Sequence, residues 1–196
     1  MFSQQQSLRR AQRRARQSGV TLTETVVALG IAGTLAAIGV PSLKQFRDKA
    51  AVDARYHDLN SALRRARSEA MIRGELVSVC ALDGDSLEAG TARCIDGGHD
   101  WSDGWLVFVD RDDRGEVESA DKIVAIYQAP ANPAPVVATL RYLTYRPSGV
   151  LLSIAAHFRF LPPGEEPVDV AVPGSALVCV NKPGKARVAT EAQCRG

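Results

Sequence analysis

An uncharged stretch of 19 residues, 25–43, constrains the fold of this chain more than any other feature. It has the sequence TVVALGIAGTLAAIGVPSL and lies between Glu24 and Lys44. A helix of that length, with a rise of about 1.5 Å per residue, measures roughly 28 Å, close to the thickness of the hydrocarbon core of a bilayer. The segment before it, 1–19, contains five arginines and no acidic residue. Because a basic flank stays on the cytoplasmic side, we expect a single membrane crossing with everything after Lys44 on the opposite side.

Two other interpretations compete with a membrane crossing. The small residues of 25–43 would also suit a buried helix of a soluble protein, but such a helix does not need an arginine-rich flank. An ordinary secretory signal cleaved near Ala37-Ile38-Gly39 stays open, although 19 uncharged residues exceed a typical signal-peptide core.

The basic segment 1–19 also decides the sign of the net charge. The whole chain carries a formal charge of +2, from 24 basic and 22 acidic residues. Without 1–19, 19 basic residues remain against the same 22 acidic ones, which gives −3. Residues 83–121 alone hold twelve acidic and three basic residues. Net charge therefore does not support nucleic-acid binding, and any such interaction would have to be local.

The start of the uncharged stretch resembles a known processing signal. The sequence GVTLTE at 19–24, followed by the apolar run as far as Pro41, is similar to the class III signal of type IV pilins and pseudopilins. This resemblance implies that prepilin peptidase cleaves after Gly19 and N-methylates Val20. It also implies that Glu24 pairs with the α-amino group of a neighbouring subunit, and that Pro41 is the proline which the family carries in this helix. A glutamate that reaches up to the lipid headgroups is the alternative for Glu24.

The helix is expected to continue through 44–73. Pro41 should kink it without ending it, and Gly74 is a natural stop. The apolar residues expected on one face are Phe46, Ala50, Leu59, Leu63, Ala66 and Ala70. The charged residues expected mostly elsewhere, on a solvated face, are Arg47, Asp48, Arg55, Asp58, Arg64 and Arg65.

After residue 74 the pattern changes to short β-rich runs. They lie at 75–82, 104–110, 122–128, 136–146, 149–153, 156–161, 175–181 and 185–190, with Gly, Pro, Asp and Asn clusters between them. About eight short strands with such turns favour antiparallel sheets. The sequence therefore predicts an α+β fold in four parts. These are a cleaved leader at 1–19, a transmembrane and assembly half of the helix at 20–43, an outer half at 44–73, and a globular antiparallel β domain at 74–196.

A second resemblance narrows the family. The segment WSDGWLVFVD at 101–110 is similar to the W-x-x-G-W-x-x-F-x-D strand of the GspH/FimT pseudopilins, and 145–149 and 177–180 resemble later strands of that family. It implies a type IV pilin-like subunit that assembles with other pilin or pseudopilin subunits. From the residues themselves, Trp101, Trp105 and Phe108 are expected in the core.

The candidate chemical sites suggest structural roles. Four cysteines allow three pairings, of which we favour Cys80–Cys94 with Cys179–Cys194. A zinc site of Cys80, Cys94 and His99 fits no common spacing. The acidic run 110–116 fails the EF-hand pattern and is expected to be a solvated turn. The sequence predicts no catalytic residue, no metal site and no cofactor.

The C-terminal tail carries the basic residues Lys182, Lys185 and Arg187. GKAR at 184–187 resembles an element of FimT-like members implicated in DNA binding during natural transformation, and an ordinary solvated hairpin is the alternative. We expect a minor pilin or pseudopilin that acts in type IV pilus biogenesis. The alternatives are a DNA-binding minor pilin for DNA uptake and a pseudopilin of a type II secretion system. We expect the protein in the inner membrane as a single-pass protein with a periplasmic C-terminal domain, and then in a filament or its tip.

Overall fold

The computed structural model describes residues 19–118 and 121–194, so the expected leader at 1–18 lies outside the described residues. Helix α1 (Leu22–Arg73) has 52 residues and contains Pro41 in its interior. It ends before Gly74, whose φ of 71° is the left-handed conformation common after a helix C-terminus. The chain divides into two compact units, one up to Ser42 and one from Leu43 onward.

The first unit consists of the N-terminal part of α1, and its apolar side chains are exposed. By length and composition, α1 is the helix among the described residues that is able to cross a membrane. Exposed fractions run from 57% for Ile31 to 81% for Leu22. These residues form no hydrophobic core within the unit.

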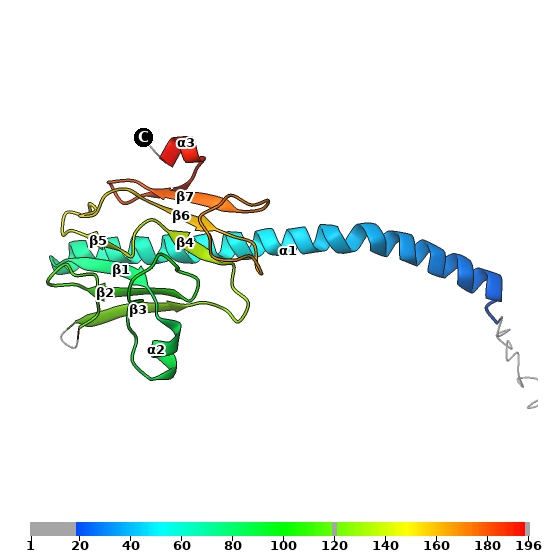
Figure 1. Ribbon diagram of the computed structural model, residues 1–196, viewed down its shortest axis with the longest axis horizontal. Helices are drawn as coiled ribbons and strands as arrows, with labels where there is room; N and C mark the ends of the chain where they lie inside the picture. The colour runs from blue at the N-terminus through cyan, green and yellow to red at the C-terminus, as the bar shows by residue number, and fades with distance from the viewer. Residues whose placement is uncertain (1–18, 119–120, 195–196) are drawn as a thin grey trace, which may run out of the picture. The chain divides into compact units, whose positions relative to one another are not determined.

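The second unit combines the C-terminal part of α1 with two four-stranded antiparallel sheets (Figure 1). The first sheet has the order β3-β2-β1-β5, with β1 at Val77–Ala81, β2 at Gly104–Val109, β3 at Lys122–Gln128 and β5 at Tyr142–Tyr145. The second has the order β4-β6-β7-β8, with β4 at Val136–Ala138, β6 at Ala156–Phe160, β7 at Ala176–Val180 and β8 at Ala186–Val188. Two short helices complete it, α2 (Gly84–Glu88) and α3 (Glu191–Cys194).

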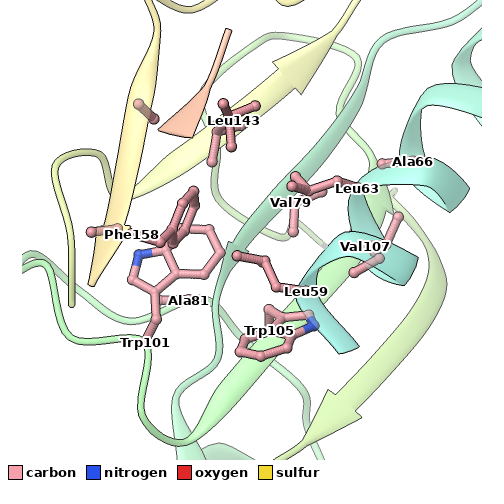
Figure 2. Close-up of a cluster of buried hydrophobic side chains, with 14 of the residues drawn as sticks. Leu59, Leu63, Ala66, Val79, Ala81, Trp101, Trp105, Val107, Leu143 and Phe158 are labelled. Carbon is pink, nitrogen blue, oxygen red and sulfur yellow. The ribbon is translucent and has the colours of Figure 1, made fainter. Parts of the chain in front are cut away.

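The main core lies between α1 and the two sheets. Figure 2 shows Leu59, Leu63 and Ala66 of α1 among strand residues and the two tryptophans, and all of these side chains are buried. Trp101 meets the ring of Phe158 edge to face, with centroids 4.9 Å apart. The expected core positions of the tryptophans are therefore confirmed.

Strands β1 and β2 are buried along their whole length because both faces of the first sheet are covered. One face packs on α1. The other carries a smaller cluster of Cys80, Leu82, Leu106 and Phe108. Phe108 is thus in a core, as expected, but in this second cluster.

The helix face differs from the expectation at its N-terminal end. Leu59, Leu63, Ala66 and Ala70 are buried as expected, but Phe46 is 71% exposed and Ala50 is also exposed. The buried face of α1 begins only at Val52. Helical spacing gives the direction of a side chain but does not show how far along the helix the β domain extends.

Three further segments differ from the secondary structure that the sequence predicts. The expected strand 136–146 is two strands in different sheets, since β4 pairs with β6 while β5 pairs with β1. The run 149–153 forms a single bridge at Leu151 and no strand. The interval between the expected strands 75–82 and 104–110 contains a short helix, α2, which begins at Gly84.

Candidate functional site

The N-terminus of α1 is closed by a reciprocal pair of hydrogen bonds. The backbone N–H of Glu24 donates to Thr21 Oγ1 at 3.2 Å, and the backbone N–H of Thr21 donates to Glu24 Oε2 at 3.5 Å. This is a capping box, in which the carboxylate lies over the positive end of the helix. Gly19 and Val20 precede the helix and are exposed, so the peptide bond between them is accessible.

The exposed part of α1 presents apolar residues on all sides. They include Val26, Val27, Leu29, Ile31, Leu35, Ile38 and Val40, each more than half exposed. A helix that is apolar all round is stable in lipid or among other helices, not in water. Pro41 lies within this segment, where it leaves one carbonyl without its helical N–H partner.

A buried arginine, Arg55, joins α1 to the strand motif. It is 3% exposed, and its Nη2 donates to the carbonyls of Trp101 at 3.3 Å and Ser102 at 2.9 Å. Its guanidinium lies 4.3 Å from the ring centroid of Trp105. The expectation that Arg55 lies on the solvated face is wrong. Arg55 lies four residues before the buried Leu59, a spacing that puts both residues on the same face of the helix. The sequence therefore contained a signal for the burial of Arg55.

The acidic run begins with a buried carboxylate. Asp110 is fully buried, accepts a hydrogen bond from Ser78 Oγ at 2.7 Å, and accepts the N–H groups of Arg114 at 3.2 Å and Gly115 at 3.0 Å. Burial raises the pKa of Asp110, although these hydrogen bonds act in the opposite direction. The expected solvated turn is therefore wrong for Asp110, which organises the turn from inside.

The cysteines are joined as Cys80–Cys94 and Cys179–Cys194, with Cα–Cα distances of 5.7 and 5.5 Å. The first disulfide fastens the loop after α2 to β1, and the second fastens α3 to β7. Across the described residues, no group of three or more His, Cys, Asp or Glu side chains is arranged to hold a metal ion.

An ion-pair network reinforces the C-terminal disulfide. Arg159 of β6 is 5% exposed and donates from Nε to Asp169 Oδ1 at 2.8 Å and from Nη2 to Glu191 Oε1 at 2.9 Å. His157 also contacts Asp169, at 3.1 Å. Burial acts to raise the pKa of Asp169, but the bonds from Arg159 and His157 outweigh it and lower that pKa. The C-terminal helix is therefore held by both a covalent bond and an ion pair.

The basic tail residues lie exposed on the β7–β8 hairpin. Lys182, Lys185 and Arg187 are all on its surface, and Lys185 faces a groove whose other wall is α1. The wall of α1 contributes Arg64 and Arg67. The sequence singled out the hairpin residues but not these helix arginines, because only the tertiary fold brings positions about 120 residues apart together.

An exposed apolar helix whose C-terminal half packs on antiparallel sheets defines a pilin-like subunit. The chain belongs to the family described as type II transport protein GspH, whose sequence model matches residues 56–190. Members of this family are structural subunits that assemble with other pilin subunits, and they are not enzymes.

Two solved structures resemble the fold, both of the type IV minor pilin FimU of Pseudomonas aeruginosa. The crystal form in space group P65 has 18% sequence identity and a TM-score of 0.46, covering 71% of this chain and 94% of FimU. The form in space group P21 has 18% identity and a TM-score of 0.48, covering 75% of this chain and 94% of FimU. No curated protein matches the sequence.

Proposed function

We propose that this chain is a minor pilin or pseudopilin that acts in type IV pilus biogenesis. It is made as a single-pass inner-membrane precursor with its C-terminal domain in the periplasm. Prepilin peptidase cleaves it after Gly19 and methylates Val20, and the subunit then enters a filament or its tip. The observation that carries this proposal is the exposed apolar half of α1, with the Glu24 carboxylate at its N-terminal end.

The mechanism of assembly is packing of helices. The apolar side chains of the segment 20–43 hold the subunit in the lipid until neighbouring helices replace the lipid contacts. A carboxylate in the apolar layer is costly unless it is paired. The cost is about 2.5–3.5 kcal/mol for an acidic group at mid-membrane. Cleavage after Gly19 creates an amino group at Val20, and the amine of the next subunit would neutralise Glu24 and set the register.

The capping box gives a sharp test of this pairing. Glu24→Gln keeps a side-chain oxygen for the N–H of Thr21, so the helix cap survives, but it removes the negative charge. Glu24→Ala removes both. We expect neither variant to restore filament assembly in a strain from which the gene has been deleted, while the β domain remains folded. Normal incorporation of the glutamine variant would show that capping suffices and would refute the pairing.

A role as a type II secretion pseudopilin is the second assignment, and the description of the matching family favours it. Deletion of the gene separates the two machines. Loss of surface pili with normal exoprotein secretion supports the pilus, whereas loss of secretion with normal piliation supports the secretion system.

DNA uptake is a further candidate, favoured by the exposed cations of the β7–β8 hairpin. Among the described residues, no acidic oxygen lies within 4.0 Å, the limit for an ion pair, of the side-chain nitrogens of Lys182, Lys185 or Arg187. These cations are therefore free to contact phosphates. The double variant Lys185→Ala with Arg187→Ala should weaken retention of DNA. Unchanged retention, or binding insensitive to salt, would remove this candidate.

A further inference from the structure

The groove between α1 and the β7–β8 hairpin has a volume of 390 Å³. It is lined by Asn60, Arg64, Arg67, Gly184, Lys185 and Ala186. Two arginines on one wall therefore face a lysine on the other, although the two walls belong to opposite ends of the sequence.

Both walls are rigid. Arg64 and Arg67 are three residues apart on α1 and therefore project from the same face, with about 5–6 Å between their Cβ atoms. The turn of the hairpin is closed by the Gly184 N–H donating to Asn181 O at 2.7 Å and the Lys185 N–H donating to Asn181 Oδ1 at 2.9 Å.

The hairpin is also fixed to the core. Tyr145 Oη donates to Gly184 O at 3.1 Å, and Gly184 has a φ of 77° with the Tyr145 ring directly where a Cβ would lie. Ala186 of β8 packs against the core, while Lys185, just before β8, and Arg187, on β8, are exposed. Lys185 lines the groove, whereas Arg187, two residues further on, lies outside the lining residues.

The cations of this region lack neutralising partners. Six arginines elsewhere in the domain are in ion pairs with acidic residues: Arg73, Arg93, Arg111, Arg114, Arg141 and Arg159. For the part of the chain that the structure describes, no acidic oxygen lies within 4.0 Å of Arg64, Arg67, Lys185 or Arg187. The three cations that line the groove, Arg64, Arg67 and Lys185, repel one another, and an anion in the groove would relieve that repulsion.

We propose that Arg64 and Arg67 of α1 form the second wall of a binding site for the phosphodiester backbone of duplex DNA. This inference rests on the DNA-uptake candidate and adds residues to it that lie outside the tail. Guanidinium groups donate two parallel hydrogen bonds to phosphate oxygens, and the lysine adds a third cation. Arg187 adds an exposed cation on β8 beyond the groove lining, so the positive charge extends past the groove, which suits a repeating chain of charges better than a single carboxylate.

The composition of the groove also determines how DNA is bound. None of its lining residues is aromatic, so bases have no stacking platform. Recognition therefore uses the backbone alone, without reading the sequence, and duplex DNA binds at least as well as a single strand. Binding falls with salt as expected from counterion release, with a slope of about −0.9 per phosphate contact.

The test uses the protein processed after Gly19, in detergent, so that the five arginines of 1–19 do not contribute, and fluorescence anisotropy with a labelled duplex of mixed sequence. Phosphate contacts by the three groove cations and by Arg187 give a slope of log affinity against log salt of about −3.6, and each double substitution should reduce its magnitude by about 2. The variants are Arg64→Ala with Arg67→Ala on the helix wall, and Lys185→Ala with Arg187→Ala on the hairpin, where Lys185 lines the groove and Arg187 lies beside it. The matched control is Arg65→Ala with Lys122→Ala, which removes two exposed charges outside the groove and should leave the slope unchanged.

The outcomes separate this inference from the candidate function. Equal losses in the two groove variants, with unchanged near-UV circular dichroism, support the composite site. A helix-wall variant that behaves like the control, while the hairpin variant loses binding, overturns the composite site but leaves the tail as a DNA contact. Absence of binding by the wild-type protein removes both. Single-stranded DNA bound more than tenfold tighter than duplex overturns backbone-only recognition, and a poly-glutamate peptide bound more tightly than DNA reassigns the groove to an acidic protein.

Discussion

Substitution of Arg55 by methionine tests how the pilin-like domain is fixed to its helix. Methionine keeps an unbranched apolar stem of similar reach but removes the guanidinium. The change abolishes the bonds to the carbonyls of Trp101 and Ser102, at 3.3 and 2.9 Å, and the contact with Trp105 at 4.3 Å.

The expected magnitude follows from these contacts. A buried carbonyl left without a donor costs about 1–3 kcal/mol, and a cation over an aromatic ring contributes about 0.5–2 kcal/mol. The substitution also relieves a penalty, because burial lowers the pKa of Arg55 against the opposing effect of Asp58 and Asp103. The Trp101 carbonyl still accepts the Gly104 N–H at 3.2 Å, so only the Ser102 carbonyl loses its donor. Replacing a buried charge by an apolar group can gain about 1–4 kcal/mol, and we therefore expect a net loss of about 1 kcal/mol in the free energy of unfolding.

The assay is guanidinium chloride unfolding of the full-length protein in detergent, followed by tryptophan fluorescence. The chain has two tryptophans, Trp101 and Trp105, and both are fully buried next to the substituted position. Arg65→Met, on the exposed side of the same helix, is the matched control and should change stability by no more than about 0.5 kcal/mol. An Arg55→Met variant as stable as the wild type would show that the guanidinium carries a net desolvation cost and does not lock the helix.

Three further predictions concern the turn after β2 and the first disulfide. Burial raises the pKa of Asp110, so the folded state holds its proton more tightly and this contribution to stability falls as pH rises above the ordinary carboxyl pKa. The stability difference between the wild type and Asp110→Asn should therefore shrink from about pH 4 to about pH 7 in urea titrations, and a widening difference would contradict this. Gly115→Ala should cost at least about 2 kcal/mol in the same assay, because φ is 69° and the Tyr142 ring occupies the Cβ position; an unchanged midpoint would be inconsistent with this geometry. Cys80→Ser with Cys94→Ser should lose about 3 kcal/mol, the value for closing a loop of about 15 residues, and a loss below about 1 kcal/mol would refute a stabilising role for this disulfide.

The sequence was sufficient for the class of fold because the decisive patterns are local. The uncharged stretch 25–43, the glycine stop at 74 and the apolar strand 104–110 each depend on neighbouring residues. The division of 136–146 between two sheets could not be predicted in the same way. Both halves are equally β-rich, and their partners, β6 and β1, are set by long-range pairing.

The residues that sequence reasoning missed are charged residues whose environment is tertiary. Arg55 is buried because carbonyls 46 and 47 residues away accept its hydrogen bonds. Arg64 was expected on a plain solvated face, yet the hairpin carrying Lys185 turns that face into one wall of a groove. Asp110 was assigned to an exposed acidic run, whereas Ser78 and two backbone N–H groups hold it inside.

The measurement that tests the proposed function most directly is mass spectrometry of the mature N-terminus, purified from the native membrane. The proposal predicts a chain that begins at N-methylated Val20, because the accessible bond after Gly19 is the proposed processing site. Cleavage near Gly39 would indicate ordinary secretion, and an intact leader starting at Met1 would indicate a plain anchor. Either result would contradict assembly through the N-terminal helix.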